Sequence, residues 1–227
     1  MTRVTVLGAT GRSGSAVLEQ LPAHVRITAA LRKPEDRTRL PVLEREVTGV
    51  VVDIEDPVSL RRSVAGADVV VNAIRLREDI DPSALVELHD RVTKAAEAPS
   101  GGVPLIVTVG GAGALRLPDG TRFWQDPAFP GPTLPRGRAH ARFRDYLEAG
   151  QSGGSWAYLV PPPVFDPDGP STGGYHTWPA AADESAFCGR SISYVDFAEA
   201  VCAAVEERWT GTRLVAEPER SAEEARG

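Results

Sequence analysis

The fold of this chain is decided by the segment Val4-Thr5-Val6-Leu7-Gly8-Ala9-Thr10-Gly11-Arg12-Ser13-Gly14. An apolar run leads into three glycines spaced by three, and a helical pattern follows. Gly8 permits a tight turn, Gly11 lets a pyrophosphate approach the backbone, and Gly14 lets the helix pack close to the strand. The start of the helix would offer free N–H groups to the phosphates. The order of strand, loop and helix therefore predicts a dinucleotide site, with contacts from Gly8, Thr10, Gly11, Arg12, Ser13 and Gly14.

Short apolar runs alternate with helical patterns along the rest of the chain. The predicted strands are residues 4–7, 25–31, 49–52, 68–73, 105–109 and 156–160, with 213–216 as a candidate edge strand. The predicted helices are residues 14–21, 57–64, 82–97, 135–149 and 195–209, the second and third capped by Asp56 and Asp81 ahead of a proline. The strands show little polar alternation, as is typical of strands buried on both faces. We therefore predict an α/β fold with a Rossmann-type, doubly wound parallel sheet.

The end of the second strand bears on the choice of cofactor. An NAD site has an acidic residue there, which binds the ribose 2′-hydroxyl. Arg32 and Lys33 occupy this place, and a cationic cluster suits the 2′-phosphate of NADP. Both side chains could instead be solvated charges, and Glu35 and Asp36 lie close by. We expect NADP(H) in preference to NAD(H).

The ends of the later strands supply the remaining predicted cofactor contacts. They are Asp53 and Ile54 for the adenine, Asn72, Ala73 and Ile74 for the ribose and diphosphate, and Val109, Gly110 and Gly111 for the nicotinamide. Asp53 could accept a hydrogen bond from the adenine amino group, or it could simply form a turn or cap a helix.

Two segments interrupt the alternation of strands and helices. Residues 116–135 hold five prolines, residues 161–179 hold six, and each follows a predicted strand. Loops of this length in a compact domain are often lids or binding loops, and ligands of open α/β sheets bind at the carboxyl ends of the strands. We expect one domain over residues 1–227, with both loops on the substrate side and a flexible tail over residues 217–227.

The composition is that of a globular protein and excludes several functions. Hydrophobic residues make up 42% of the 227 residues, and the net charge of −6 disfavours binding to nucleic acid. We find no apolar run of about 20 residues and no signal-peptide pattern, so we expect no membrane partner. The two cysteines and the lack of a Cys-x-x-Cys motif suit a reducing cytoplasm. No cluster suggests a metal, and the chain is expected to be a monomer or a homodimer.

Motifs spread over nearly the whole chain resemble the atypical short-chain dehydrogenase/reductase family. The matching segments are residues 8–14, 31–34, 52–54, 109–111, 161–165, 171–175 and 193–198. The similarity is greatest to the NmrA-like, NAD(P)H-binding branch, which includes flavin and biliverdin-IXβ reductases. The resemblance implies a small C-terminal substrate lobe and an NADPH site whose contacts include Pro162 and Val164. It also implies hydride transfer to an acceptor that lies over the nicotinamide.

The chain departs from this family at the groups that transfer protons. The larger family uses a Tyr-x-x-x-Lys pair, but Tyr146 and Tyr175 are followed four residues later by Gly150 and Pro179. Val164 stands where the flavin reductases often carry a histidine. The remaining catalytic candidates are His140, with an ordinary pKa of about 6.5, and Tyr175, which matches the Thr-Gly-x-Tyr motif of the branch. His140 could equally be a surface histidine, and Tyr175 could serve in packing.

The sequence therefore predicts an NADPH-dependent oxidoreductase whose small-molecule acceptor resembles a flavin or quinone. Such an acceptor can take its proton from water, which suits a site without the tyrosine–lysine pair. The aromatic residues of the two loops, Trp124, Phe129, Phe165 and Trp178, could stack on it or seal the loops. Two alternatives stay open. One is a redox sensor that binds NADP(H) without turnover, and the other is an epimerase, dehydratase or isomerase on the same fold.

Overall fold

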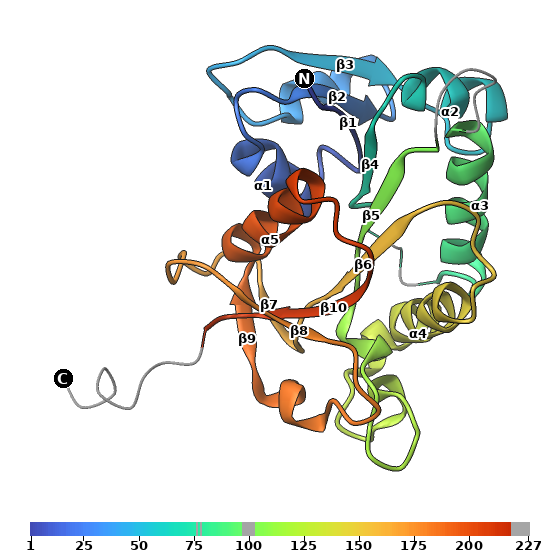
Figure 1. Ribbon diagram of the computed structural model, residues 1–227, viewed down its shortest axis with the longest axis vertical. Coiled ribbons are helices and arrows are strands. Elements are labelled where there is room, and N and C mark those ends of the chain that lie inside the picture. Colours follow the sequence, from blue (N-terminus) through green and yellow to red (C-terminus); the bar gives the residue numbers. More distant parts are fainter. Residues whose placement is uncertain (76, 78, 97–102, 219–227) are drawn as a thin grey trace.

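A computed structural model describes residues 1–75, 77, 79–96 and 103–218 (Figure 1). Eight strands form the central sheet in the order β3-β2-β1-β4-β5-β6-β10-β8. Their bounds are β1 (Arg3–Leu7), β2 (Arg26–Leu31), β3 (Val47–Val51), β4 (Val69–Asn72), β5 (Leu105–Val109), β6 (Trp156–Val160), β8 (His176–Pro179) and β10 (Gly211–Ala216). All neighbours pair in parallel except β8, which is antiparallel to β10. The predicted doubly wound Rossmann-type sheet is confirmed.

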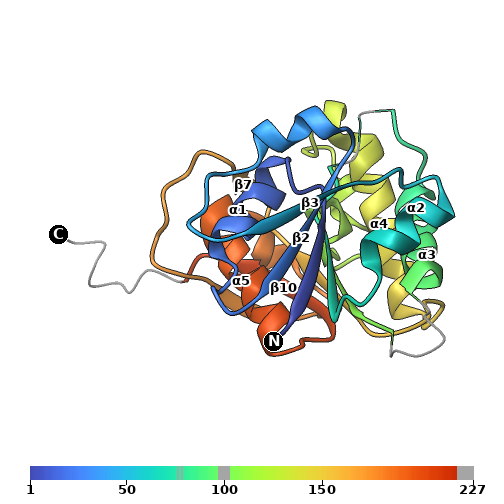
Figure 2. The ribbon, with the colours of Figure 1, turned by 90° about the horizontal axis from the view of Figure 1, so that it is seen from above.

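Helices cover both faces of the sheet, as Figures 1 and 2 show. On one face α1 (Arg12–Gln20) packs against α5 (Tyr194–Glu206), and on the other α2 (Pro57–Val64), α3 (Ala84–Ala96) and α4 (Leu134–Glu148) pack in succession. Short 3-10 helices interrupt the loops: η1 (Pro34–Arg39), η2 (Ala112–Ala114), η3 (Phe123–Gln125), η4 (Gly131–Thr133) and η5 (Ser185–Gly189). The two-layered cover explains why the central strands contain almost no polar residues.

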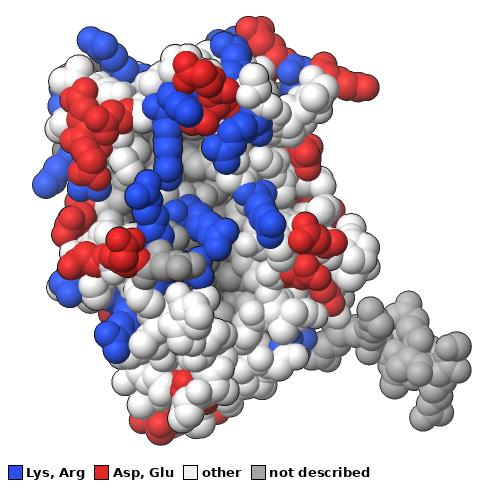
Figure 3. Space-filling model, turned by 180° about the vertical axis from the view of Figure 1, so that it is seen from behind, with Lys and Arg blue, Asp and Glu red and all other residues white. Residues whose placement is uncertain are grey.

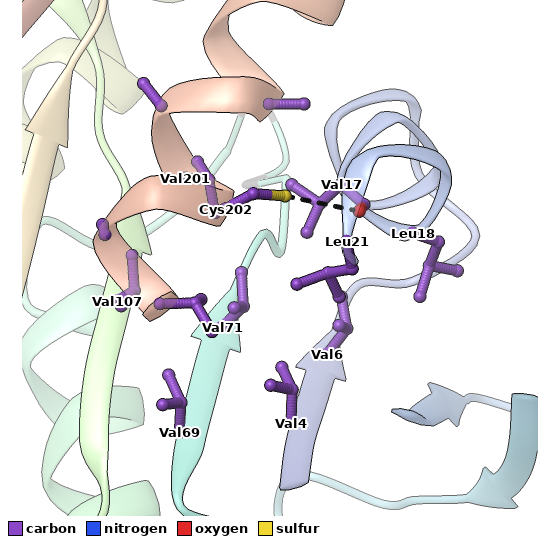
Figure 4. Close-up of a cluster of buried hydrophobic side chains, with 14 of the residues drawn as sticks. Val4, Val6, Val17, Leu18, Leu21, Val69, Val71, Val107, Val201 and Cys202 are labelled. Carbon is purple, nitrogen blue, oxygen red and sulfur yellow. Dashed lines mark hydrogen bonds between the residues drawn. The ribbon is translucent and has the colours of Figure 1, made fainter. Parts of the chain in front are cut away.

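The sheet and the first helix pair enclose an apolar core, shown in Figure 4. Val4 and Val6 of β1 lie next to Val69 and Val71 of β4, because β1 and β4 pair in parallel with Val4 opposite Val69. Val17 of α1 and Val201 of α5, both at most 1% exposed, close the core above the strands. This packing fixes the start of α1 relative to the carboxyl ends of β1 and β4.

The second half of the sheet differs from the prediction. The segment around residues 213–216 was expected at an edge, but β10 lies inside the sheet between β6 and β8. The edge is instead β8, a four-residue strand inside the proline-rich segment 161–179. This segment also holds β7 (Val164–Asp166), which pairs with β9 (Ser191–Ser193) in a small second sheet. The predicted loop is thus partly regular structure and forms the C-terminal lobe.

Helix caps explain one accurate boundary and one wrong one. Asp56 accepts a hydrogen bond from the Val58 backbone N–H and α2 begins at Pro57, as predicted. Asp81 accepts instead from the backbone N–H and hydroxyl of Ser83, which makes a turn, and α3 begins two residues late at Ala84. The predicted end of this helix at residue 97 lies outside the described residues, as does most of the predicted tail, residues 219–227. No helix in the described ranges has the length and apolarity to cross a membrane.

Candidate nucleotide-binding site

The glycine loop joins β1 to α1 in a conformation that two of its glycines require. Gly8 has a φ of +78°, and a Cβ there would lie 2.6 Å from the carbonyl oxygen of Ala73. A Cβ on Gly14 would lie 2.2 Å from the carbonyl oxygen of Gly8. These positions therefore exclude every residue with a side chain, the first through backbone conformation and the second through helix packing.

Gly11 has a different role from its neighbours. It has an extended conformation, with φ −84° and ψ 162°, which any residue can adopt. A Cβ there would meet only the carbonyl oxygen of Gly8, at 3.2 Å. A side chain at Gly11 would require the Gly8 carbonyl to shift by a few tenths of an ångström, so local packing restricts Gly11 far less than Gly8 or Gly14.

The start of α1 lies open beside Gly11. Arg12, Ser13 and Gly14 are its first three residues, and no side chain caps the helix. The first N–H groups of a helix have no intrahelical acceptor and carry the positive end of its dipole. The loop and helix start thus provide the cradle and donor set that a pyrophosphate needs.

The end of β2 gathers cations next to the loop. Arg32 and Lys33 are exposed, and within the described part of the chain neither lies within 4.0 Å of a carboxylate. Arg39 of η1 adds a third cation, which donates to the carbonyl oxygen of Thr10 at 3.5 Å. Sequence reasoning missed Arg39, because only the turn of η1 brings it back to the glycine loop.

The acidic residues near Arg32 are accounted for separately. Asp36 is 4% exposed and forms an ion pair with Arg39 at 3.3 Å. Its charge is therefore balanced inside η1. Glu35 is exposed, and its carbonyl oxygen accepts from the Thr38 hydroxyl at 3.0 Å. At the end of β2 the cations Arg32, Lys33 and Arg39 thus outnumber the carboxylates of Glu35 and Asp36.

The segment 161–179 passes close to the glycine loop. Arg12 lies 4.0 Å from Asp168, with both side chains more than half exposed. An exposed pair of this kind contributes little stability, at most about 1 kcal/mol. It does, however, show that the segment after β7 comes within reach of the start of α1.

The predicted adenine and ribose contacts occupy the ends of β3 and β4. Asp53 is exposed and accepts from the Glu55 backbone N–H at 2.9 Å, which forms a turn and leaves its carboxylate able to accept further hydrogen bonds. Ile54 follows it, half-buried. Asn72 is 3% exposed, and its side-chain oxygen accepts from the Ile74 backbone N–H at 3.2 Å. Ala73 donates its backbone N–H to Leu7, which ties the end of β4 to β1.

The end of β5 brings a histidine and a tyrosine together. Gly110 follows Val109 and is locked to β6, because its N–H donates to Leu159 at 2.7 Å. A Cβ on Gly111 would lie 2.6 to 3.0 Å from three atoms of the His140 ring, including Nε2. The Nδ1 atom of the same ring lies 2.9 Å from the hydroxyl of Tyr158, a fully buried residue of β6.

Two arrangements of hydrogens fit this contact. In one, the Tyr158 hydroxyl donates to Nδ1 of His140 at 2.9 Å, and Nε2 carries the imidazole hydrogen. In the other, Nδ1–H donates to the hydroxyl, which then donates to the carbonyl oxygen of His140 at 3.4 Å. In both, the hydroxyl fixes the ring, whose face around Cδ2 lies against Gly111.

The pKa of His140 is lower than the 6.5 of an unperturbed histidine, so the imidazole stays neutral well below physiological pH. Burial lowers its pKa to about 4, and the positive charge of Arg136 adds to this effect. Burial also raises the pKa of the Tyr158 hydroxyl. The pair therefore holds a neutral imidazole rather than an acid that loses its proton near pH 6.5.

The second catalytic candidate, Tyr175, lies away from this pair. It packs against the core beneath α1 and α5, with its ring 6.3 Å from that of Trp209. His140 belongs to α4, on the other face of the sheet. Burial raises the pKa of Tyr175. Of the remaining predicted contacts, Pro162 is buried behind β6 and Val164 is 57% exposed on β7.

Three of the four aromatic side chains in the long loops pack onto neighbouring elements. The ring of Phe165 lies 4.0 Å from that of Tyr194, and that of Trp178 lies 5.6 Å from that of Phe187. Phe129 packs on α4, where a Cβ on Gly137 would lie 2.7 Å from its ring. Trp124 lines a pocket. Within the described ranges no three His, Cys, Asp or Glu residues are placed to hold a metal ion.

The whole site opens on one face of the molecule. Figure 2 shows β1 and β2 running away from the face seen in Figure 1. Figure 3 shows the opposite face, where the strands end, and a hollow there is bordered by Lys and Arg side chains. This basic rim occurs on a protein whose net charge is −6, so positive charge is concentrated at the carboxyl edge of the sheet.

Comparison with known proteins agrees with this geometry. Residues 8–208 match the family described as NAD(P)H-binding. The uncharacterised protein YwnB of Bacillus subtilis (strain 168) is 26% identical over 207 residues, which cover 88% of this chain and 90% of YwnB. The resemblance inferred from the sequence motifs is thereby confirmed.

Two solved structures share the fold at low identity. A Bacteroides thetaiotaomicron protein whose proposed activity is that of an epimerase has a TM-score of 0.80 and 24% identity, with 97% of this chain and 99% of that chain covered. A Streptococcus pneumoniae TIGR4 protein whose proposed activity is that of an NADH-flavin reductase has a TM-score of 0.73 and 23% identity, with 96% and 100% covered.

Proposed function

Because this chain belongs to the NAD(P)H-binding family, we propose that it is an NADPH-dependent reductase that transfers hydride to a flat acceptor of the flavin or quinone type. The observation that carries the proposal is the glycine loop. Gly8 and Gly14 have no room for a Cβ, whereas a Cβ on Gly11 would meet a single atom at 3.2 Å. Backbone conformation and helix packing account for Gly8 and Gly14, and a pyrophosphate beside the open start of α1 would account for Gly11.

The cations at the end of β2 support NADPH over NADH. Arg32 and Lys33 have no carboxylate within 4.0 Å among the described residues, and Arg39 reaches the Thr10 carbonyl beside them. Where an NAD site has a carboxylate, a 2′-phosphate would find two cations without a carboxylate partner, Arg32 and Lys33, and a third, Arg39, that is paired with Asp36.

The residues at the end of β5 support an acceptor that needs no dedicated acid. When bound, NADPH would supply the hydride. Gly110 and Gly111 have no room for a Cβ, because Leu159 lies against the first and the His140 ring against the second, so both glycines bring His140 close to the end of β5. His140 is held by Tyr158 and, with its hydrogen on Nε2, would offer a hydrogen-bond donor without giving up a proton. The proton that completes reduction would come from water, and the chain would act mainly through proximity and orientation.

The flavin choice has support from one structural neighbour. The Streptococcus pneumoniae protein carries a proposed NADH-flavin reductase activity. The epimerase activity proposed for the Bacteroides protein has less support here, because epimerases need a positioned base and a histidine with a pKa of about 4 is a weak one.

The test is cofactor binding combined with turnover. We expect calorimetry to show tighter binding of NADPH than of NADH, and absorbance at 340 nm to fall when FMN, riboflavin or a quinone is added with NADPH. Tight NADPH binding with no oxidation by any of these acceptors would contradict the reductase proposal and favour a redox sensor. Failure to bind either nucleotide would overturn the proposal altogether.

A further inference from the structure

A pocket of about 370 Å³ lies on the outer side of α4, away from the nucleotide cradle. One wall is α4 itself, through Arg138, Ala141, Arg142 and Asp145, which lie three or four residues apart and so share one face of the helix. The facing wall comes from the loop that contains η3, through Trp124.

The pocket is built into the fold by two glycines. A Cβ on Gly137 of α4 would lie 2.8 Å from the Cβ of Trp124, and a Cβ on Gly113 would lie 2.4 Å from the α-carbon of Gly137. Both residues allow the segment 112–125 to pack directly on α4. The aromatic wall is therefore fixed relative to the helix.

The charges in the pocket do not balance. Arg122 is 12% exposed and forms an ion pair with Asp145, while its other nitrogen donates to the carbonyl oxygen of Ala114 at 2.9 Å. Arg138 and Arg142 have no carboxylate within 4.0 Å in the described part of the chain. The pocket thus contains three cations and one anion.

One of the two arginines is held by the aromatic wall, and the other lies near a carboxylate outside the pocket lining. The guanidinium of Arg138 lies over the ring of Trp124, 4.9 Å from its centre. Arg142 follows one turn later, near enough to Asp81 to help lower the pKa of that residue, although hydrogen bonds from Ser83 contribute more. Two like charges at i and i+4 destabilise a helix. An anion between them would remove this repulsion.

The pocket adjoins the end of β5. Ala141 lines it and directly follows His140, whose ring lies against Gly111. His140 and Arg142 are two residues apart, about 200° around the helix, so they point to different faces of α4. The pocket is connected to the carboxyl edge of the sheet by the segments after β4 and β5, which line it through Pro82 and Trp124. A molecule at the end of β5 would therefore reach the pocket along these segments.

From this geometry we propose that the Arg138–Arg142 pocket binds a phosphate or carboxylate carried by the acceptor, so that the acceptor is an anionic aromatic molecule. This inference rests on the proposed function, because the bound molecule is taken to be the hydride acceptor. The binding step can nevertheless be measured without any hydride transfer.

The experiment compares FMN with riboflavin, which have the same ring system and differ in the phosphate. Each is titrated into the protein at saturating NADP⁺, so that the nucleotide cradle is filled, and binding is followed by flavin fluorescence. We expect FMN to bind at least about tenfold more tightly, since a charge-assisted hydrogen bond has roughly that effect. The double variant Arg138→Gln/Arg142→Gln should bring the two affinities within about twofold of each other.

Arg26→Gln is the matched control. It removes one positive charge from an exposed residue of β2 at the opposite, amino edge of the sheet, and it should retain the preference for FMN. Three results would contradict anion binding in this pocket. They are equal affinities of the wild type for FMN and riboflavin, no detectable binding of FMN, and a preference for FMN that persists in the double variant. Preferential FMN binding without NADPH oxidation would support the anion-binding pocket and contradict the proposed reductase activity.

Discussion

The hydroxyl of Tyr158 lies 2.9 Å from Nδ1 of His140 and joins β6 to α4 at the point where β5 ends. Tyr158 is fully buried, so it fixes the imidazole rather than following it. The face of the ring lies against Gly111, where any side chain would collide with it. One hydrogen bond thereby holds a neutral imidazole beside the proposed nicotinamide position.

The first prediction concerns the role of His140. His140→Ala should lower kcat with a flavin acceptor by less than about tenfold, or ~1.4 kcal/mol, because water can supply the proton. The pH profile should be flat near 6.5, since burial lowers the pKa of His140 to about 4 and leaves it neutral from pH 5 upward. NMR titration of the histidine ring checks the pKa directly.

A thousandfold loss in His140→Ala with cofactor affinity retained would contradict this account. So would a fall in rate near pH 6.5 that disappears in the variant. Tyr158→Phe is the companion variant, because it keeps the ring of residue 158 and removes only the hydroxyl that orients His140. Its NMR spectrum should show a change in the balance of the two imidazole tautomers.

The second prediction concerns the choice between NADPH and NADH. Arg32→Asp should weaken NADPH by ~1–3 kcal/mol, the range of charge-assisted hydrogen bonds, and leave NADH nearly unchanged. Arg39→Gln should act in the same direction, because Arg39 lies at the Thr10 carbonyl. Calorimetry with both cofactors measures the effect, and Arg26→Asp at the far edge of the sheet controls for net charge. Equal affinity of the wild type for both cofactors would refute this assignment.

The third prediction separates the glycines of the loop. Gly11→Val should abolish binding of either cofactor but destabilise the fold by only about 1 kcal/mol, because the backbone of Gly11 is extended and its Cβ would meet a single atom, the Gly8 carbonyl oxygen at 3.2 Å. Gly14→Ala should destabilise the fold as well, since its Cβ would lie 2.2 Å from the Gly8 carbonyl oxygen. Chemical denaturation and cofactor titration distinguish the two.

Gly189→Ala is the control for these variants, because a Cβ there meets no atom within 4 Å and the φ is not positive. It should change neither stability nor binding. Normal cofactor affinity in Gly11→Val would show that the loop is not the binding site.

The fourth prediction concerns a buried ion pair that ties α4 to the C-terminal lobe. Arg144 and Glu184 have no exposed side-chain surface and meet through two hydrogen bonds of 2.7 and 2.8 Å. Glu184→Gln should lower the free energy of unfolding by about 3–5 kcal/mol, because it leaves a buried guanidinium with one partner fewer. The exposed pair Arg91–Glu55 is the control, and Glu55→Gln should cost less than about 1 kcal/mol.

This pair also predicts that the free energy of unfolding decreases at acid pH. Burial alone would raise the pKa of Glu184, but the hydrogen bonds and charge of Arg144 outweigh it and lower that pKa. A carboxyl group with a lowered pKa stabilises the folded state above its unfolded pKa of about 4.3, and this contribution is lost as pH falls through the folded value. Denaturation curves below pH 4 should therefore become less pH-dependent in Glu184→Gln. An unchanged slope would contradict this.

The sequence was most informative where structure depends on neighbouring residues. The glycine spacing predicts the turn and the close packing of Gly14, and Asp56 with Pro57 predicts the start of α2, because each is set within a few residues. The first helix begins at Arg12, two residues before the predicted start at residue 14. At Asp81 the predicted start is two residues early, and there the hydroxyl of Ser83 also donates to the carboxylate.

The features missed from the sequence all depend on distant contacts. β8 and β10 pair across more than thirty residues, and β8 has a proline and few apolar residues to mark it as a strand. Arg39 approaches Thr10 only because η1 turns back. Tyr158 lies eighteen residues from His140, so spacing gives no sign that a buried hydroxyl orients the histidine and that burial lowers its pKa.

The most direct test of the reductase account is anaerobic single turnover with a flavin, followed at 340 nm for NADPH and at 450 nm for the flavin. The account predicts that both absorbances fall at one rate, and that this rate decreases when one of the two hydrogens at C4 of NADPH is replaced by deuterium but not when the other is. The stereospecific effect would show that the cofactor is held in one orientation against the acceptor. Tight NADPH binding with no change at either wavelength, whatever the acceptor, would contradict the account.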